Sequence, residues 1–542
     1  MKLLPSAHLD TFCRDNLPAE QTWPELSFDL PELQYPDRLN CATALLEDTI
    51  AVHGGDRPCA LAPHETWSYD EVRRCSNRIA NVLVSECGLV PGQRVLLRGP
   101  NAPWLLACWL GVLKAGGVVV TTMPLLRRTE LATLIELTRP AFALCEQRFT
   151  DDLEAVAGQV RVLTYPGSRA AAATTGEGDR LDVLAAAVSE DFDAVQTSSD
   201  DVAMLAPTSG TTGQPKVTMH FHRDVLAIAD TFGKYTIQAT PDDIFTGTPP
   251  LAFTFGLGAL AVFPLRIGAS VLLLERATPA ELAELIAEHR VSVLSTAPTA
   301  YRAILRSGKA STLTSLRRCV SAGEHLPEPV WQQWYSETGV KIINGLGSTE
   351  MLHVFIAAAD EQIVPGATGI PVPGYQACVL DPAGVPVPDG QAGRLAVRGP
   401  TGCRYLSGDR QTVYVQDGWN LTGDTYIRDS SGYYWYQARS DDMIVSSGYN
   451  IGAPEVEWVL DQHPDVVESA VIGSPDPERG AVVHAFVVLR DGVSGDAAKV
   501  AELQAFAKAQ IAPYKYPRRI DFVDALPRTQ TGKLQRYRLR SD

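Results

Sequence analysis

The segment Ala206–Val217 reads APTSGTTGQPKV, and its composition guides the interpretation of the whole chain. Glycine turns leave backbone N–H groups available, hydroxyls flank them, and Lys216 adds an ammonium group, so the segment can form a concave site for nucleotide phosphates. It is not the P-loop of NTPases, because Pro215 and Val217 stand where that motif requires a glycine and a serine or threonine. A polar turn between two strands is the alternative interpretation.

Composition narrows the class of protein. The chain has 542 residues and a formal net charge of −16, which argues against a nucleic-acid partner or an anionic membrane surface. Ten cysteines without a C-x-x-C pair favour neither a zinc site nor a disulfide framework and fit a reducing cytoplasm. The longest apolar stretch, 104–126, is interrupted by Lys114 and the pair Gly116–Gly117, so no membrane span is predicted. We therefore expect a cytoplasmic protein.

Alternation of short apolar runs with helical patterns predicts an α/β fold. RVLLRG from Arg94, APWLLACWLGVLKAGG from Ala102 and VVVTTMP from Val118 suggest strand, helix and strand, and TPAELAELIAEHR from Thr278 begins with a capping box. Short strands between Pro/Gly turns follow from about residue 366 and suggest a small β-barrel. We expect a large domain over residues 1–437, with subdomains at about 1–200, 201–365 and 366–437, and a small, mobile α+β domain over 438–542.

Four further motifs follow the first one along the chain. They are NGLGSTE at Asn344, shortly after SAGEHLP at Ser321, then LTGD at Leu421, ARSDDMI at Ala438 and PRTQTGKLQR at Pro527. Together, in this order and spacing, the five motifs resemble the adenylate-forming superfamily of acyl-CoA synthetases, peptide-synthetase adenylation domains and firefly luciferase. The resemblance runs from about residue 40 to the carboxyl terminus.

The resemblance implies that ATP and a carboxylic acid form an acyl-adenylate, after which a thiol displaces AMP. Cations and oriented donors must offset the repulsion between the carboxylate and the triphosphate. Lys533, Glu350 and Lys216 are the expected catalytic residues, with Glu350 as the Mg²⁺ ligand. The residues expected to bind ATP or AMP are Thr208, Ser209, Gly210, Thr211, Thr212, Gly213, Lys216, Gly323, Glu324, Asn344, Gly345, Leu346, Ser348, Thr349, Asp424, Arg439 and Lys533. Solvated surface lysines are the alternative for Lys216 and Lys533, and a turn aspartate is the alternative for Asp424.

Two further roles follow from the resemblance. Asp441 matches the hinge about which the small domain turns between the half-reactions. The loop with Ser447, Gly448 and Tyr449 is expected beside the coenzyme A tunnel. Similar aryl-CoA ligases often carry a lysine where this chain has Val445, which leaves the details of thioester formation open.

The acyl site is predicted from PPLAFTFGLG at Pro249 and GLGSTEMLHVF at Gly345, which resemble 2-aminobenzoate- and benzoate-CoA ligases, as does LPSAHLDTFCRDNLP at Leu4. Amino-acid-activating relatives place an aspartate where Thr254 stands, so an α-amino acid is not expected. Core packing is the alternative for Phe263, and a structural histidine is the alternative for His353. The His220–His222 pair is interpreted as packing, since two ligands do not make a metal site. The predicted substrate pocket comprises Phe253, Thr254, Phe255, Phe263, Gly347 and His353.

The sequence therefore predicts an AMP-forming acid–thiol ligase that uses ATP, Mg²⁺ and coenzyme A to activate 2-aminobenzoate or a similar benzoate. A stand-alone enzyme that loads an aryl acid onto a carrier-protein phosphopantetheine is one alternative. A non-catalytic adenylate-binding protein is another, although it would have no use for Lys533, Glu350 and Lys216 together. The sequence leaves a homodimer open.

Overall fold

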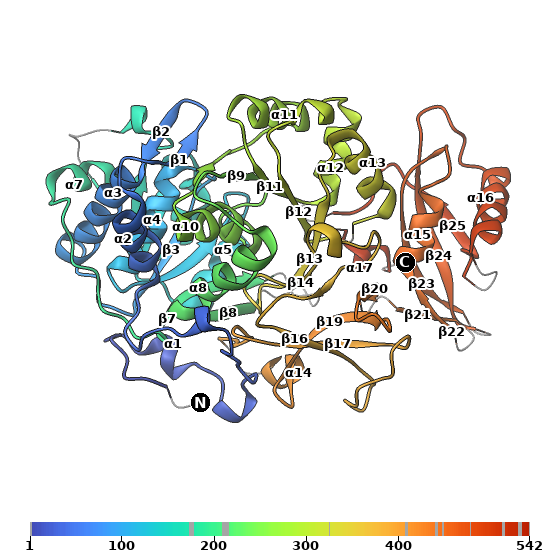
Figure 1. Ribbon diagram of the computed structural model, residues 1–542, viewed down its shortest axis with the longest axis horizontal. Helices are drawn as coiled ribbons and strands as arrows, with labels where there is room; N and C mark the ends of the chain where they lie inside the picture. The colour runs from blue at the N-terminus through green and yellow to red at the C-terminus, as the bar shows by residue number, and fades with distance from the viewer. Residues whose placement is uncertain are drawn as a thin grey trace. The chain divides into compact units, whose positions relative to one another are not determined.

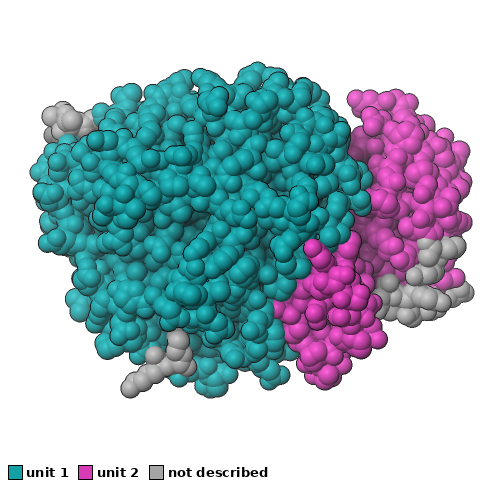
Figure 2. Space-filling view, viewed as in Figure 1, with its two compact units in different colours: residues 1–376, 397–420 teal, residues 377–396, 421–542 magenta. Residues whose placement is uncertain are grey.

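A computed structural model describes residues 3–172, 178–208, 216–324, 326–406, 410–439, 443–446, 449–476, 479–511, 515–528 and 534–540. The chain, whose helices and strands are labelled in Figure 1, divides into two compact units, residues 1–376 with 397–420 and residues 377–396 with 421–542 (Figure 2). The boundary between the two units crosses the region 366–437 more than once. The domain boundary predicted at residue 437 therefore stays a prediction.

In the first unit, six strands within the described ranges form a mostly parallel sheet in which β8 alone is antiparallel to its neighbour. Their order is β6 (Arg161–Tyr165), β5 (Phe142–Glu146), β3 (Arg94–Arg98), β4 (Val118–Thr122), β7 (Val202–Thr208) and β8 (Lys216–Phe221). β3 and β4 with the intervening helix α4 (Pro103–Lys114) confirm the predicted strand, helix and strand. β3, β4 and β5 are buried along their whole length, and most of their residues are apolar, as expected for strands covered on both faces.

Nine described strands form the second sheet of this unit, parallel in its centre and antiparallel at both edges. Their order is β15 (Ile370–Pro371), β14 (Val354–Ala357), β13 (Ile342–Gly347), β12 (Arg318–Ala322), β11 (Val293–Thr296), β9 (Ile244–Gly247), β10 (Ser270–Leu272), β1 (Pro58–Ala62) and β2 (Glu65–Ser68). A helix lies between β10 and β11, another between β11 and β12, and another between β12 and β13: α11 (Pro279–Glu288), α12 (Pro298–Arg306) and α13 (Glu328–Thr338).

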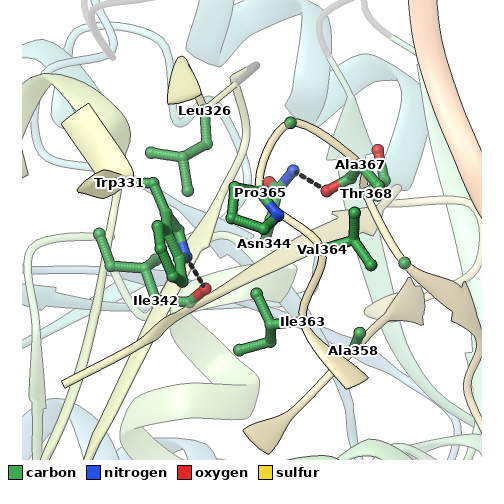
Figure 3. Close-up of a pocket in the computed structure, with 12 residues that line it drawn as sticks. Leu326, Trp331, Ile342, Asn344, Ala358, Ile363, Val364, Pro365, Ala367 and Thr368 are labelled. Carbon is green, nitrogen blue, oxygen red and sulfur yellow. Dashed lines mark hydrogen bonds between the residues drawn. The ribbon is translucent and has the colours of Figure 1, made fainter. Parts of the chain in front are cut away.

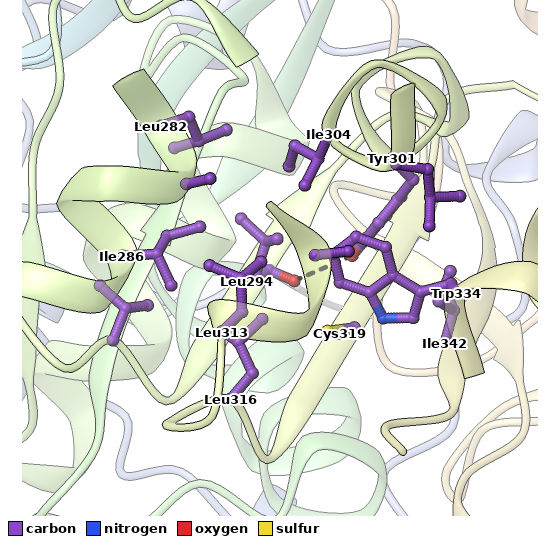
Figure 4. Close-up of a cluster of buried hydrophobic side chains, with 14 of the residues drawn as sticks. Leu282, Ile286, Leu294, Tyr301, Ile304, Leu313, Leu316, Cys319, Trp334 and Ile342 are labelled. Atoms are coloured by element: carbon purple, nitrogen blue, oxygen red, sulfur yellow. Dashed lines mark hydrogen bonds between the residues drawn. The ribbon is translucent and has the colours of Figure 1, made fainter. Parts of the chain in front are cut away.

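Helix α11 has the predicted capping box, in which Thr278 accepts the Glu281 N–H and the Glu281 side chain accepts the Thr278 N–H. Its buried face packs with α12, α13 and the strands β11 to β13 in one apolar cluster (Figure 4). Trp334 and Tyr301 meet edge to face in this cluster, with ring centroids 4.7 Å apart. This cluster fixes one face of the strands β12 and β13, whose carboxyl ends carry predicted ATP-site residues.

The remaining helices of the first unit connect the strands or precede them. They are α1 (Phe12–Asp15), α2 (Cys41–His53), α3 (Tyr69–Asn81), α5 (Arg128–Thr138), α6 (Asp151–Glu154), α7 (Leu181–Ala187), α8 (His222–Ile228), α9 (Thr254–Leu257), α10 (Phe263–Ile267) and α14 (Gln411–Tyr414). Helix α8 continues directly into a π-helical segment at Ala229–Ile237. A second π-helical segment, Gly258–Val262, connects α9 with α10.

A third sheet corresponds to the predicted small β region. Its order is β16 (Gln376–Leu380), β17 (Ala392–Arg398), β19 (Trp419–Arg428) and β18 (Val415–Gln416), with β20 (Tyr434–Arg439) also on β19. The first unit contains the pairing of β18 with the start of β19, and the second unit contains the pairing of β19 with β20.

The carboxyl-terminal part of the second unit is a compact α+β structure, as predicted. The strands β23 (Val466–Asp476), β24 (Gly480–Leu489) and β25 (Arg519–Phe522) form a sheet that shares an apolar cluster with α15 (Ala453–Leu460) and α16 (Ala497–Gln510). A short hairpin of β21 (Met443–Ser446) and β22 (Tyr449–Gly452) precedes α15, and α17 (Arg536–Leu539) is the last helix described.

Across the described residues, the helices are all too short or too polar to cross a membrane. The ten cysteines all lie in described parts of the chain, and none of them forms a disulfide. The predicted fold class, a large α/β domain with mostly parallel sheets and a small β-barrel, followed by a small α+β domain, is confirmed, and the region predicted as a β-barrel is the curled third sheet.

Candidate active site

The strands β7 and β8 bring together the two ends of the predicted phosphate loop. Thr208 and Lys216 are partners in the antiparallel register of these strands. Because β7 is also parallel to β4, the loop lies at the carboxyl end of a parallel strand, the edge where open α/β sheets bind ligands. Five predicted loop residues lie outside the described residues: Ser209, Gly210, Thr211, Thr212 and Gly213.

Tyr405 connects Lys216 with Glu350. Its hydroxyl donates a 2.7 Å hydrogen bond to Glu350 Oε1, and Lys216 Nζ lies 5.9 Å from the centroid of its ring. Tyr405 is 3% exposed and forms a backbone bridge with Thr218 on β8, so the ring is held firmly in place. Burial and the negative charge of Glu350 raise the pKa of Tyr405 well above its ordinary value, so the hydroxyl remains a donor. Sequence reasoning missed Tyr405, because nothing near it in the sequence links it to Glu350.

The turn between β13 and β14 carries Glu350. Ser348 Oγ lies 3.2 Å from the hydroxyl of Tyr414 and accepts the backbone N–H of Met351 at 3.2 Å. A Cβ atom on Gly347 would lie 2.7 Å from the carbonyl oxygen of His353, so the close return of the chain requires glycine. The predicted ATP-site residues of this turn are half-buried: Ser348, Thr349 and Glu350.

Several of the residues predicted to bind ATP or AMP lie at the carboxyl ends of β12 and β13, which are parallel neighbours. Gly323 follows β12 with a φ of +90°, a conformation that favours glycine, and Glu324 comes next. Asn344 and Gly345 pair with Ser321 and Ala322 of β12. Tertiary structure thus places residues some twenty positions apart in sequence along one edge.

Asn344 also fixes the segment that follows β14. Its amide Nδ2 donates to the carbonyl oxygen of Ala367 at 3.3 Å, and Asn344 lines a small hollow together with Leu326, Ile363 and Val364 (Figure 3). Leu346, which is also predicted to bind ATP or AMP, is half-buried on β13.

In the second unit, Asp424 on β19 and Arg439 on β20 face each other. They are partners in the strand register, and Arg439 Nη1 lies 3.0 Å from Asp424 Oδ1. Gly423 has a φ of +77°, and a Cβ atom there would lie 2.9 Å from the Arg439 guanidinium. The glycine of the LTGD motif therefore gives Arg439 room to reach the aspartate, whose side chain is only 9% exposed.

The predicted acyl-site residues meet in an aromatic cluster. The ring of His353 lies 4.7 Å from that of Phe263, edge to face, and 5.7 Å from that of Phe255. Phe232, from the π-helical segment Ala229–Ile237, lies 5.3 Å from His353 and was not predicted, because no motif surrounds it. Phe253 and Phe255 are half-buried at the start of α9, where Thr254 is buried.

His353 is 3% exposed and belongs to the packing of this cluster. Burial lowers the pKa of His353 to about 3, although a backbone group of Phe255 acts to raise it. The imidazole is therefore neutral near pH 7. Neither ring nitrogen meets the geometry of a hydrogen bond with the described part of the protein. A Cβ atom on Gly258 would lie 2.4 Å from the imidazole, so this glycine makes room for the ring.

Four of the predicted site residues lie outside the described residues: Lys533, Asp441, Ser447 and Gly448. Tyr449 is the first residue of β22 and pairs with Ser446 of β21. The roles of all five residues stay predictions.

One group with the spacing of metal ligands occurs among the described residues: His463, Asp465 and Glu502 of the second unit. Lys499 Nζ lies 2.6 Å from both carboxylates, so an ammonium group already balances their charge. His220 and His222 are fully buried, and burial lowers their pKa values to about 4 and about 3. Their neutral, enclosed rings fit the packing role predicted for them.

Comparison with known families gives two matches along this chain. Residues 46–405 match the model of the AMP-binding enzyme family, and residues 455–533 match that of the AMP-binding enzyme C-terminal domain. Both matches agree with the motifs from which the adenylate-forming superfamily was predicted.

The relatives include enzymes that act on aromatic acids. The chain is 35% identical to a benzoate–CoA ligase of Thauera aromatica over 94% of its length and 97% of the relative's. The crystal structure of the anthranilate CoA ligase AuaEII with anthranoyl-AMP superposes with a TM-score of 0.88 at 31% identity, covering 94% of this chain and 98% of that one. A benzoate CoA ligase from Burkholderia xenovorans LB400 gives a TM-score of 0.83 at 30% identity, covering 93% and 100%.

Proposed function

This chain belongs to the family of AMP-binding enzymes, and from that premise we propose that it is an ATP-dependent aryl-acid–CoA ligase for 2-aminobenzoate or a similar benzoate. One observation carries the proposal: a single turn contains both Glu350 and His353. Glu350 accepts a hydrogen bond from the tyrosine beside Lys216, and His353 is enclosed by aromatic rings. The turn therefore connects groups suited to phosphate chemistry with a wall suited to a planar acid.

In the first half-reaction, a carboxylate oxygen of the acid attacks the α-phosphorus of ATP. The bond from that phosphorus to the oxygen bridging the α- and β-phosphates breaks, and pyrophosphate leaves with the electron pair. We assign Lys216 and Lys533 to stabilise the negative charge that builds up on the phosphates. Asp424 is assigned to the two ribose hydroxyls, since a carboxylate can accept both hydrogen bonds.

Glu350 fits the requirements of a Mg²⁺ ligand. Mg²⁺ prefers oxygen ligands and typically takes one or two carboxylates together with substrate phosphates. When bound, the ion would neutralise part of the triphosphate charge. Tyr405 fixes one oxygen of the Glu350 carboxylate, so its orientation is set before ATP arrives. In the second half-reaction, the thiol of coenzyme A loses its proton to solvent and its sulfur attacks the acyl carbonyl carbon. The bond from that carbon to the phosphate oxygen breaks, and AMP leaves with the electron pair.

The substrate class follows from the wall beside His353. Phe255 and Phe263 pack around a neutral imidazole, and Thr254 supplies no charge to hold an α-ammonium group. A flat, uncharged ring suits such surroundings, because aromatic rings favour offset or edge-on contacts. In 2-aminobenzoate the amine is neutral and bonds its own carboxylate, which keeps the molecule planar.

Pyrophosphate release across a panel of acids tests the proposal. We expect 2-aminobenzoate to be activated best, benzoate and small ortho-substituted analogues less well, and para-substituted or aliphatic acids poorly. Discrimination against benzoate should be modest, since one hydrogen bond contributes about 0.5–1.5 kcal/mol. His353→Ala should narrow that preference and retain benzoate activation. A panel ranking octanoate or 4-hydroxycinnamate first would refute the aryl site but leave adenylate formation intact.

The final acceptor needs a separate comparison because Val445 replaces the lysine common in similar aryl-CoA ligases. We propose free coenzyme A, with a carrier-protein phosphopantetheine as the second candidate. Thioester formation from preformed acyl-adenylate, measured with coenzyme A and with a phosphopantetheinylated carrier, decides between them. Failure to release pyrophosphate with any acid would favour a non-catalytic adenylate-binding protein. A cytoplasmic location and a homodimer remain predictions.

A further inference from the structure

A cleft of about 470 Å³ opens in the first unit behind the aromatic cluster. It lies between the π-helical segment Ala229–Ile237, helix α10 and the amino-terminal segment around Glu32. Its volume falls within the range of about 300–1,000 Å³ typical of small-molecule pockets. None of the roles proposed above uses this cleft.

Phe263 belongs to both the cleft and the aromatic cluster. It lines the cleft, while its ring meets His353 at 4.7 Å and Phe232 at 5.9 Å. With 1% of its surface exposed, the side chain fills the space between them. The wall between His353 and the cleft is thus one aromatic ring thick.

Glycines lie against this ring on both of its packed sides. A Cβ atom on Gly258 would lie 2.9 Å from Phe263 Cζ, on the side that also contacts His353. A Cβ atom on Gly233, which lines the cleft, would lie 3.2 Å from Phe263 Cδ1. Because neither glycine carries a side chain, the ring of Phe263 itself fills the space beside both of them.

The charged groups of the cleft are paired with one another. Asp230 accepts from Arg266 at 2.9 and 3.1 Å and from the Tyr35 hydroxyl at 2.8 Å, and Lys234 pairs with Glu32. The other lining residues are small or apolar, among them Phe263 and Ile267. The cleft therefore suits an uncharged, apolar group, because an added charge would have to compete with existing ion pairs.

We infer that Phe263 determines the length of acid that the enzyme accepts, by closing the acyl site off from a cleft able to hold an apolar substituent. This inference rests on the proposed aryl site. In the native protein the ring excludes benzoates with long para substituents. Without the ring, the acyl site and the cleft form one continuous pocket, and acids such as 4-butylbenzoate and 4-phenylbenzoate fit.

The test compares pyrophosphate release with 4-butylbenzoate and with benzoate in the wild type and in Phe263→Ala. We expect the ratio of the two kcat/KM values to rise at least about tenfold, the scale on which an apolar pocket distinguishes small changes in length. Ile267→Ala is the matched control, since it enlarges the cleft on the same helix and leaves the ring in place. Adding Gly233→Leu to Phe263→Ala should refill the cleft and reverse the gain.

An unchanged ratio in folded Phe263→Ala, or an equal rise in Ile267→Ala, would overturn the inference. If Phe263→Ala does not fold, Phe263→Leu should shift the ratio in the same direction by a smaller factor. Calorimetric titration with 4-phenylbenzoate, without ATP, separates this inference from the proposed function. If 4-phenylbenzoate binds the variant more tightly than the wild type, the Phe263 ring separates the acyl site from the cleft, even if no benzoate is turned over. Equal binding refutes this role of the ring. Wild-type turnover of benzoate tests the proposed function independently.

Discussion

The hydroxyl of Tyr405 donates a 2.7 Å hydrogen bond to Glu350 Oε1, linking a buried aromatic residue to the predicted metal ligand. Tyr405 follows Glu350 by 55 positions and is anchored to β8, the strand that begins with Lys216. The strand β8, the segment that contains Tyr405 and the turn after β13 thus together determine the orientation of the Glu350 carboxylate.

Removal of this hydroxyl should impair the use of Mg²⁺. In Tyr405→Phe we expect the Mg²⁺ concentration for half-maximal pyrophosphate release to rise and the adenylation rate to fall about 10- to 100-fold, because a hydrogen bond to a charged group contributes about 1.5–3 kcal/mol. Calorimetric titration of ATP with and without Mg²⁺ should show that only the Mg²⁺-dependent part of binding is lost. Tyr414→Phe removes a neighbouring hydroxyl that bonds Ser348, and it should leave the Mg²⁺ dependence close to that of the wild type.

Asp424→Asn should weaken ATP binding and reduce the preference of the enzyme for ATP over 2′-deoxy-ATP. The wild type is expected to favour ATP over 2′-deoxy-ATP, since the carboxylate accepts from both hydroxyls. In the variant, the KM for ATP should rise about 10- to 100-fold and the preference over 2′-deoxy-ATP should shrink. Asp389→Asn removes the partner of Arg428 in an exposed ion pair of the same unit and should change neither value. An unaltered preference in Asp424→Asn would argue for the turn-aspartate alternative.

His353 should make the protein less stable in mild acid. Its pKa is about 3 in the folded protein and about 6.5 when unfolded, so between these values the unfolded chain binds more protons. Stability from the neutral imidazole is present above pH 6.5 and is lost as the pH falls, by about 2 kcal/mol between pH 7 and pH 5. The denaturation midpoint of His353→Phe should therefore fall less over this range than that of the wild type. The exposed His64 is hydrated in both states, so His64→Gln should follow the wild type.

Lys533→Ala should separate the two half-reactions. We expect acid-dependent ATP–pyrophosphate exchange to fall about 10²–10³-fold, the effect of losing one charged transition-state contact, whereas added acyl-adenylate should still react with coenzyme A. Lys508→Ala, which removes a lysine stacked on Tyr516 at 4.0 Å, should leave both rates unchanged. Undiminished exchange in Lys533→Ala would favour the solvated-lysine alternative.

Asp441→Pro should produce the opposite pattern. Proline fixes φ near −65°, so a hinge at this position could no longer make its turn. Adenylation should survive and thioester formation should fall, both measured from single turnovers. Asp441→Ala, which keeps the backbone free to rotate, should retain both steps. Equal losses in the proline variant would indicate a role other than a hinge.

Local patterns were sufficient for much of the fold. The capping box of Thr278 and Glu281 predicted the start of α11, because its hydrogen bonds join residues only three positions apart. The apolar run from Val118 predicted a buried strand, because strands covered on both faces of a sheet consist largely of apolar residues. The five motifs also identified the family and the residues at the loop ends and strand ends, since each motif lies within a few consecutive residues.

Relationships between distant residues required the tertiary structure. Phe232 and Phe263 have no shared motif with His353, and only the packing of a π-helical segment and α10 against the turn after β13 brings their rings together. The same is true of Tyr405 and Glu350. Sequence alone determined which chemical groups the chain carries and the local backbone that presents them. The tertiary structure decided which groups touch, and thus the neutrality of His353 and the orientation of Glu350, because burial and hydrogen bonding act through space between residues far apart along the chain.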